Sequence, residues 1–124
     1  MFEMNKYGID EKDILIANES YLVTMPAQIG NAEIAPDENG RKIIKQGTAL
    51  KGDLLKRDTA LTKGTNADAV AILLHNVDVT DGNANGTIVI AGAIDVNKLG
   101  TEEAAAIDST MVERLPSIIF VKGV

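Results

Sequence analysis

The chain has 124 residues, a length that suits one compact domain, and it is 45% hydrophobic but only 3% aromatic. We therefore expect a core of many small aliphatic side chains. The absence of cysteine excludes disulfides and thiolate metal sites within this sequence. A formal net charge of −6 argues against general nucleic-acid binding, because phosphate contact needs surplus Lys and Arg.

No targeting segment is evident in the sequence. Acidic residues interrupt the first 15 positions, so this stretch does not resemble a signal peptide. No segment approaches the roughly 20 apolar residues that a membrane-spanning helix needs. We expect a soluble protein that is made in the cytoplasm and contacts no membrane.

Basic residues are concentrated in one part of the chain. Seven of the twelve lie between positions 41 and 63, where the only acids are Asp53 and Asp58, so this stretch carries +5 and the remainder carries −11. Lys and Arg on exposed short strands discourage edge pairing, and this is the interpretation we favour. The alternative is a basic face that binds an acidic partner.

Residues 1–35 are predicted to form an extended N-terminal arm. ILIAN (14–18) and YLVTM (21–25) are strand candidates within it, and Pro26 is expected to end the second. Such strands can pair inside the domain or add to the exposed sheet edge of a partner, and both alternatives remain open. PDENG (36–40) is a strong turn signal that separates this arm from the main body.

Short strands and tight turns are expected through the middle of the chain. Glycines at 47, 52 and 64 separate brief apolar pieces, and two longer strand candidates follow in AVAILLHNVDV and GTIVIAGAIDV. Gly92 should mark a bulge or a close backbone approach. Alternation places two sets of side chains on one face each: Val70, Ile72 and Leu74 in the first strand, and Ile88, Ile90, Ile94 and Val96 in the second.

The C-terminal part should contain one or two short helices. Thr101 is a candidate cap for a first helix with an acidic first turn, and Thr110 opens a capping-box spacing for a second. Pro116 should end that helix, and SIIFV (117–121) should follow as a buried strand.

The predicted fold class is α+β and mostly β. We expect a small β-rich domain over residues 36–124, with the short helices near its C-terminus and the extended arm over 1–35. Both faces of the GTIVIAGAIDV strand are largely apolar. They should therefore be covered by the rest of the domain or by a neighbouring subunit.

The run D-x-N-x-N-G at 81–86 matches the start of an EF-hand calcium loop. The twelfth loop position, where a bidentate Glu should bind, is Gly92, and both flanks alternate as strands. A hairpin turn explains the same residues, because Asp-Gly and Asn-Gly supply positive φ. The alternative is a small calcium- or carbohydrate-binding β-module whose site would use Asp78, Asp81, Asn83 and Asn85.

Catalytic motifs are not apparent. His75 is the only histidine, so no histidine pair can hold zinc, and a small hydrolase that uses it is a minor hypothesis. No serine has nucleophile-elbow glycines around it, and no glycine-rich phosphate loop is present. We expect neither an enzyme nor a cofactor.

Two phrases carry a resemblance to a known family: ILL-x-x-VDVTDG at 72–82 and G-x-ID-VNKL at 92–99. With the preceding KQGTALKGDLL and the closing SIIFV, residues 40–124 resemble the head-decoration and head-fibre proteins of tailed bacteriophages, a group that includes lambda-type capsid decoration proteins. The resemblance implies a β-rich decoration domain that forms a homotrimer at threefold or quasi-threefold positions. There it would bind the major capsid protein on the outer surface of the virion and stabilise the shell, without touching nucleic acid directly.

The resemblance carries over no catalytic or cofactor residues, so contact residues are chosen from their position and type. The candidates for binding the capsid are apolar or aromatic residues of the arm and the first two basic residues after the turn: Tyr7, Ile14, Ile16, Tyr21, Val23, Arg41 and Lys42. The candidates for the trimer interface are the small apolar face of the second long strand and the lone histidine: Val89, Ala91, Ala93 and His75.

Overall fold

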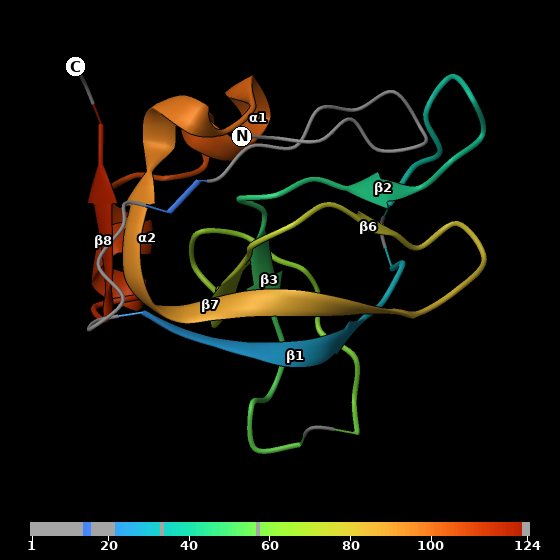
Figure 1. The fold of residues 1–124 in the computed structure, drawn as a ribbon, viewed down its shortest axis with the longest axis horizontal. Coiled ribbons are helices and arrows are strands. Elements are labelled where there is room, and N and C mark those ends of the chain that lie inside the picture. The colour runs from blue at the N-terminus through green and yellow to red at the C-terminus, as the bar shows by residue number, and fades with distance from the viewer. Residues whose placement is uncertain (1–13, 16–21, 33, 57, 123–124) are drawn as a thin grey trace.

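The central feature of the fold is a strongly bent sheet (Figure 1). The computed structural model describes residues 14–15, 22–32, 34–56 and 58–122, which form a mostly β domain with two short helices near the C-terminus, as the sequence predicts. The strands are β1 (Val23–Ile29), β2 (Ile43–Ile44), β3 (Ala49–Lys51), β4 (Thr62–Lys63), β5 (Ala71–Leu73), β6 (Val77–Asp78), β7 (Ala84–Asp95) and β8 (Ile118–Val121). The helices are η2 (Val96–Lys98), α1 (Thr101–Ala105) and α2 (Ser109–Arg114).

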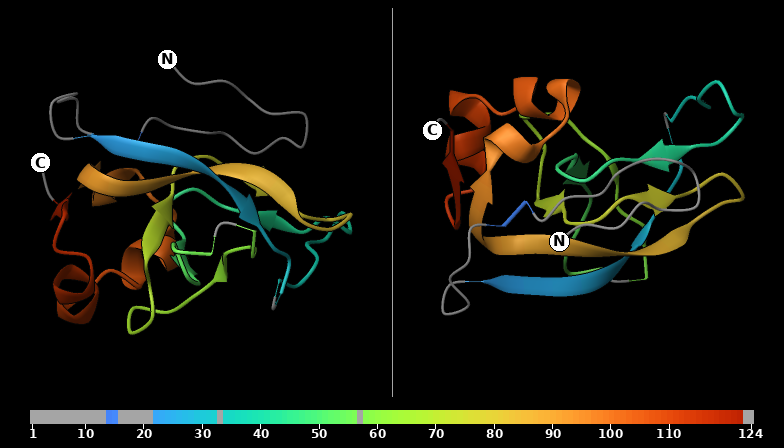
Figure 2. Two further views of the ribbon diagram at one scale, coloured as in Figure 1. Left: turned by 90° about the horizontal axis from the view of Figure 1, so that it is seen from below. Right: turned by 45° about the horizontal axis from the view of Figure 1, so that its top comes forward.

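The main sheet has the strand order β1-β7-β5-β3-β4, and β8 also pairs with β7. Neighbours are antiparallel except β7 and β8, which run parallel after a crossover through the helices. β2 and β6 form a separate two-stranded sheet. The helices and β8 gather at one end of the molecule and the β2–β6 pair lies at the other, with β1 and β7 running side by side between them (Figure 2).

Two hydrophobic clusters cover opposite faces of the central strands. In β5, Ile72 belongs to one cluster and Leu73 to the other, and in β7 Val89 and Ile88 divide in the same way. This division follows from the strand period of two, which turns successive side chains to opposite faces. Helix α2 and β8 cover the first cluster, whereas β2, β6 and Leu61 cover the second.

Part of the expected N-terminal arm is a strand of the main sheet. β1 pairs along its length with β7, so this segment pairs inside the domain. The strand also runs through Pro26 instead of ending there. β1 is the terminal strand of the described sheet, and a proline without an N–H is tolerated on such an edge.

The expected continuous strand AVAILLHNVDV is broken at His75. Residues before the break pair with β3 and β7 as β5, and residues after it pair with β2 as β6. Asn76 fixes the break, because its Oδ1 accepts a hydrogen bond from the backbone N–H of Gln46 at 2.8 Å. Ile72 and Leu74 share a cluster as predicted, but Val70 packs against the other one.

A bulge in β7 overturns the predicted face of the second strand. Val23 pairs with Ala91 while Thr24 pairs with Val89, which leaves Ile90 as an extra residue. Ile88 and Ile90 therefore pack on the second cluster and Ile94 on the first. The close backbone approach expected at Gly92 is confirmed, because a Cβ there would lie 3.1 Å from Leu22 Cδ1.

Two turns are closed by aspartate side chains. In the predicted 36–40 turn, Asp37 Oδ1 accepts hydrogen bonds from the backbone N–H groups of Asn39 at 2.9 Å and Arg41 at 3.0 Å. Before β5, Asp68 Oδ1 accepts one from the Thr65 N–H at 2.6 Å. This backbone bond, with smaller contributions from the Thr65 hydroxyl and the charge of Lys51, lowers the pKa of the Asp68 carboxyl below its usual value.

The helix starts differ from those predicted. The N-cap of α1 is Gly100, one residue before Thr101, and no side chain caps it. The N-cap of α2 is Asp108, whose carboxylate accepts a hydrogen bond from the Met111 N–H at 3.1 Å. Helix α2 ends at Arg114, two residues before the expected terminator Pro116.

We predict that Gly47→Ala destabilises the fold more than Gly40→Ala does. Both glycines have left-handed φ, of 86° and 75°, so alanine at either site costs about 1–2 kcal/mol in backbone strain. Only at Gly47 would the new Cβ overlap the Leu99 side chain, whereas Gly40 has open space around it. Overpacking brings the expected loss for Gly47→Ala to roughly 2–5 kcal/mol in urea unfolding.

A double variant isolates the steric part of this loss. Adding Leu99→Ala to Gly47→Ala removes the overlapping atoms, so the two substitutions together should cost less than the sum of their separate costs. Additive losses, or equal losses for Gly40→Ala and Gly47→Ala, would contradict the packing role of Gly47.

Candidate functional site

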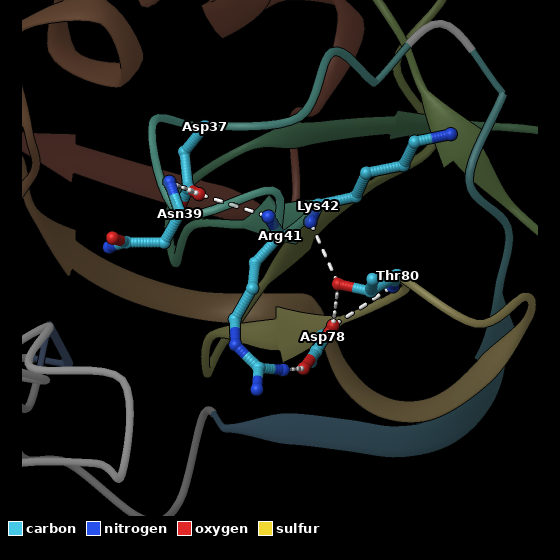
Figure 3. A network of polar contacts seen from close by, with 6 residues as sticks. All are labelled: Asp37, Asn39, Arg41, Lys42, Asp78 and Thr80. Carbon is cyan, nitrogen blue, oxygen red and sulfur yellow. Dashed lines mark hydrogen bonds and ion pairs between the residues drawn. The ribbon is translucent and has the colours of Figure 1, made fainter.

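Arg41 and Lys42, two of the candidate capsid contacts, belong to an ordered polar network beside the β2–β6 pair (Figure 3). Asp78 is its centre: Oδ2 binds Arg41 Nη1 at 3.2 Å, and Oδ1 accepts hydrogen bonds from the backbone N–H and the hydroxyl of Thr80. Thr80 Oγ1 in turn accepts the Lys42 backbone N–H at 2.8 Å. The network therefore fixes the direction of the guanidinium, which stays 43% exposed.

The remaining candidate capsid contacts divide into three groups. Ile14 is fully buried in the first cluster, and its carbonyl accepts a hydrogen bond from the Asp95 N–H at 2.8 Å. Ile14 thus helps to build the core, and its side chain is not on the surface. Val23 is exposed at the start of β1. Tyr7, Ile16 and Tyr21 lie outside the described residues.

The candidate trimer-interface residues are separated by the bulge in β7. Val89 is fully buried in the first cluster, so its side chain is not on the surface of this chain either. Ala91 and Ala93 are half-buried on the outer side of the same strand. His75 lies elsewhere, exposed at the break between β5 and β6.

Ala91 and Ala93 are part of an apolar strip on the outside of the sheet. Val23 pairs with Ala91, and Ile119 of β8 pairs with Ala93, so these side chains share a face across three strands. Val121 continues the strip along β8. The exposed fractions are 47% for Val23, 63% for Ile119 and 40% for Val121. We call these five residues the outer strip.

Sequence reasoning missed two of the five residues of the outer strip, Ile119 and Val121. SIIFV was expected to form a buried strand, but only Ile118 of β8 is buried and Ile119 points outward. Every residue of β8 is apolar, so no alternation of apolar and polar residues marks its outer face. The sequence of this strand therefore contains no signal that separates its outward residues from its buried one.

An open groove of about 360 Å³ lies between β2, β3, β4 and the start of α1. Ile43 and Ile44 contribute its apolar part, and charged side chains of both signs line the rest: Asp37, Lys45, Lys63, Glu102 and Glu103. The two lysines belong to the basic stretch predicted from the sequence. This mixture of carboxylates and ammonium groups gives the groove no uniform charge for steering an ion.

The loop that resembles a calcium site is arranged as a turn. Both carboxylate oxygens of Asp78 accept hydrogen bonds from Arg41 and Thr80, and Asn85 Oδ1 accepts one from Gln28 Nε2. Gly82 has positive φ as expected, but Gly86 does not. Gly86 is a strand residue that makes room for Ile29, whose Cγ1 would lie 2.7 Å from an added Cβ. No group of three or more His, Asp or Glu side chains able to hold a metal is found in the described part of the chain.

Comparison with known proteins assigns no family. No protein-family model matches the sequence, and no curated protein matches it significantly. Among the described residues, no helix combines the length and apolar character needed to cross a membrane.

Calcium titration tests the β-module alternative directly. We predict no heat of binding at millimolar calcium, because Asp78 is already engaged by Arg41 and Thr80 and Asn85 by Gln28. Isothermal calorimetry of the wild-type chain and of an Asp81→Asn variant should give identical baselines. A saturable heat that disappears in the variant would contradict the turn interpretation.

Proposed function

We propose that the chain is a non-catalytic decoration protein, which binds the outer surface of a tailed-phage capsid as a trimer and stabilises the shell. The observation that carries the proposal is the resemblance of the ILL-x-x-VDVTDG and G-x-ID-VNKL phrases to the head-decoration family. Its major partner is the major capsid protein.

The positions of these phrases in the fold support the proposal. The first phrase supplies β5, the break at His75, β6 and Asp78, and the second supplies the bent end of β7 and the 3₁₀ turn that follows. Asp95 caps that turn by accepting a hydrogen bond from the Asn97 N–H at 3.0 Å. The residues that carry the resemblance thus lie in strands of both sheets and in the turns that follow them, where a shared fold would place conserved packing.

The surface also supports association with other protein chains. The outer strip exposes large aliphatic side chains on a sheet face, which is the type of surface that homo-oligomers bury. The fixed guanidinium of Arg41 and the exposed Val23 remain candidates for contact with the capsid. Ile14 and Val89 are buried, so we propose neither Ile14 as a capsid contact nor Val89 as a trimer contact.

Phage particles from the host that makes this chain provide the test. We expect purified virions to contain the chain in a fixed ratio to the major capsid protein. Particles from a deletion strain should release their DNA at a lower temperature, and addition of the purified chain should restore the wild-type release temperature. Virions without the chain, or deletion particles with unchanged heat resistance, would contradict the proposal.

The outer strip makes a separate prediction about assembly. Wild-type protein should sediment, free or after release from particles, as a species of three times the 13.2 kDa chain mass. Ile119→Asp places a charge that would have to be buried in the strip interface, so it should give folded monomers whose circular dichroism spectrum matches that of wild type. Val112→Asp is the matched control, because Val112 is exposed on α2 and lies outside the strip. Identical masses and identical particle occupancy for wild type and Ile119→Asp would exclude the strip as the interface.

A further inference from the structure

Two Asn-Gly sequences occur in the chain, Asn39-Gly40 and Asn85-Gly86. Asparagine is a thermolabile residue, and it deamidates most readily before glycine, because glycine has no side chain to hinder attack of its backbone nitrogen on the asparagine amide. The attack also requires the backbone around the pair to leave its native conformation. The two sites therefore differ in reactivity according to how firmly the fold holds each of them.

The Asn39-Gly40 pair lies at the tip of the 36–40 turn, and both residues are exposed. The space around Gly40 is open, since an added Cβ would meet no atom within 4 Å. The Asn39 amide points away from the polar network of Arg41 and Asp78 (Figure 3), and none of the described residues forms a hydrogen bond with it. The Asn39 Cγ is thus accessible to the neighbouring backbone nitrogen and to water.

Local hydrogen bonds restrain the attacking nitrogen. The Gly40 N–H donates to the Asp37 carbonyl at 2.9 Å, and the Asp37 carboxylate accepts the N–H groups of Asn39 and Arg41 on either side. These bonds lie within one exposed turn, so the turn can open without disturbing either hydrophobic cluster. Local opening therefore frees the Gly40 nitrogen at a small cost in free energy.

The Asn85-Gly86 pair is held by strand pairing. Asn85 pairs with Gln28 and Gly86 with Ala27 between β7 and β1, and Asn85 Oδ1 accepts a hydrogen bond from Gln28 Nε2. The fully buried Ile29 packs against Gly86, with its Cγ1 2.7 Å from the position of an added Cβ. Attack at this site requires β7 to separate from β1. The chain thus contains the same two-residue sequence in a protected setting, which serves as an internal reference.

We propose that Asn39 is a self-modifying site, at which the chain deamidates through a cyclic imide, and that the isoaspartyl product opens the turn before Arg41. The Gly40 nitrogen loses its proton to hydroxide and bonds to Asn39 Cγ, while the Cγ–Nδ2 bond breaks and the amide nitrogen, protonated by water, leaves as ammonia. Water then adds to either imide carbonyl and yields aspartate or isoaspartate, so neither an oxidant nor a cofactor is consumed. The inference goes beyond the proposed decoration function and does not depend on it.

The two products differ in their effect on the turn. Aspartate keeps the course of the backbone and only converts an exposed amide into a carboxylate. Isoaspartate routes the backbone through the side chain, which inserts one carbon between the N–H groups of residues 39 and 41. In the structure these two groups reach the same Asp37 oxygen, at 2.9 and 3.0 Å. After the insertion that oxygen can no longer accept both bonds, and the turn loses the contacts that place the Arg41 backbone.

Peptide mass mapping of the purified chain, kept for weeks in mildly alkaline buffer, tests the site. Position 39 should gain the mass of one water and lose that of one ammonia, and in heavy-oxygen water it should take up one labelled oxygen. Modification at Asn39 should be at least about tenfold faster than at Asn85, because separating paired strands costs more free energy than opening a turn. Equal rates at the two positions, or faster modification of Asn85, would overturn the proposal.

Three variants separate the chemistry from its effect on the turn. Asn39→Gln is the matched control: it keeps an exposed amide but needs a larger ring, so position 39 should stay unmodified while the rate at Asn85 is unchanged. Asp37→Ala removes the acceptor of two turn bonds and should raise the rate at Asn39 several-fold, whereas an unchanged rate would contradict control by the turn. The Arg41 N–H should exchange with deuterium faster in the purified isoaspartyl form than in Asn39→Asp. Equal exchange in both would overturn the opening of the turn.

Discussion

The fold depends on the pairing of β5 with β7, where two adjacent cross-strand pairs face opposite ways. Ile72 and Val89 meet on one face, and Leu73 and Ile88 meet on the other. A sheet that is apolar on both faces must be covered twice, and each cover comes from a different part of the chain. Helix α2 and β8 supply one cover and the β2–β6 pair supplies the other, so the domain is organised in layers around these four side chains.

Composition and local signals were sufficient for the class of fold and for several turns. The few aromatics and many aliphatic residues indicated a core of small side chains, and the 36–40 turn formed where Pro, Asp and Gly predicted it. The errors arose where contacts between distant segments determine the course of a strand. Asn76 breaks a run that looks like one strand because it bonds to a distant backbone group, and the bulge at Ile90 reverses a face that regular alternation would preserve. The alternation of apolar and polar residues along a single strand predicts neither the break at Asn76 nor the bulge at Ile90.

Candidate contact residues were harder to predict than elements, because exposure depends on which partner strand lies opposite. Ile14 and Val89 resemble Val23 and Ile119 in chemistry, yet the first two are buried and the last two are exposed. Arg41 is a candidate capsid contact because of its charge. Its ion-pair partner Asp78 is distant in sequence, so the residues around Arg41 do not reveal the pair.

The first cluster joins the two ends of the described chain. Ile14 and Ile118 pack together in it, and β8 reaches β7 only after η2, α1 and α2 have been formed between them. During synthesis on the ribosome, this cluster therefore stays open until β8 has emerged. The nascent protein would expose Ile72, Val89 and Ile94 on one face throughout elongation. Closure of this cluster therefore waits for β8, and until then its apolar face is a surface on which the growing chain can aggregate.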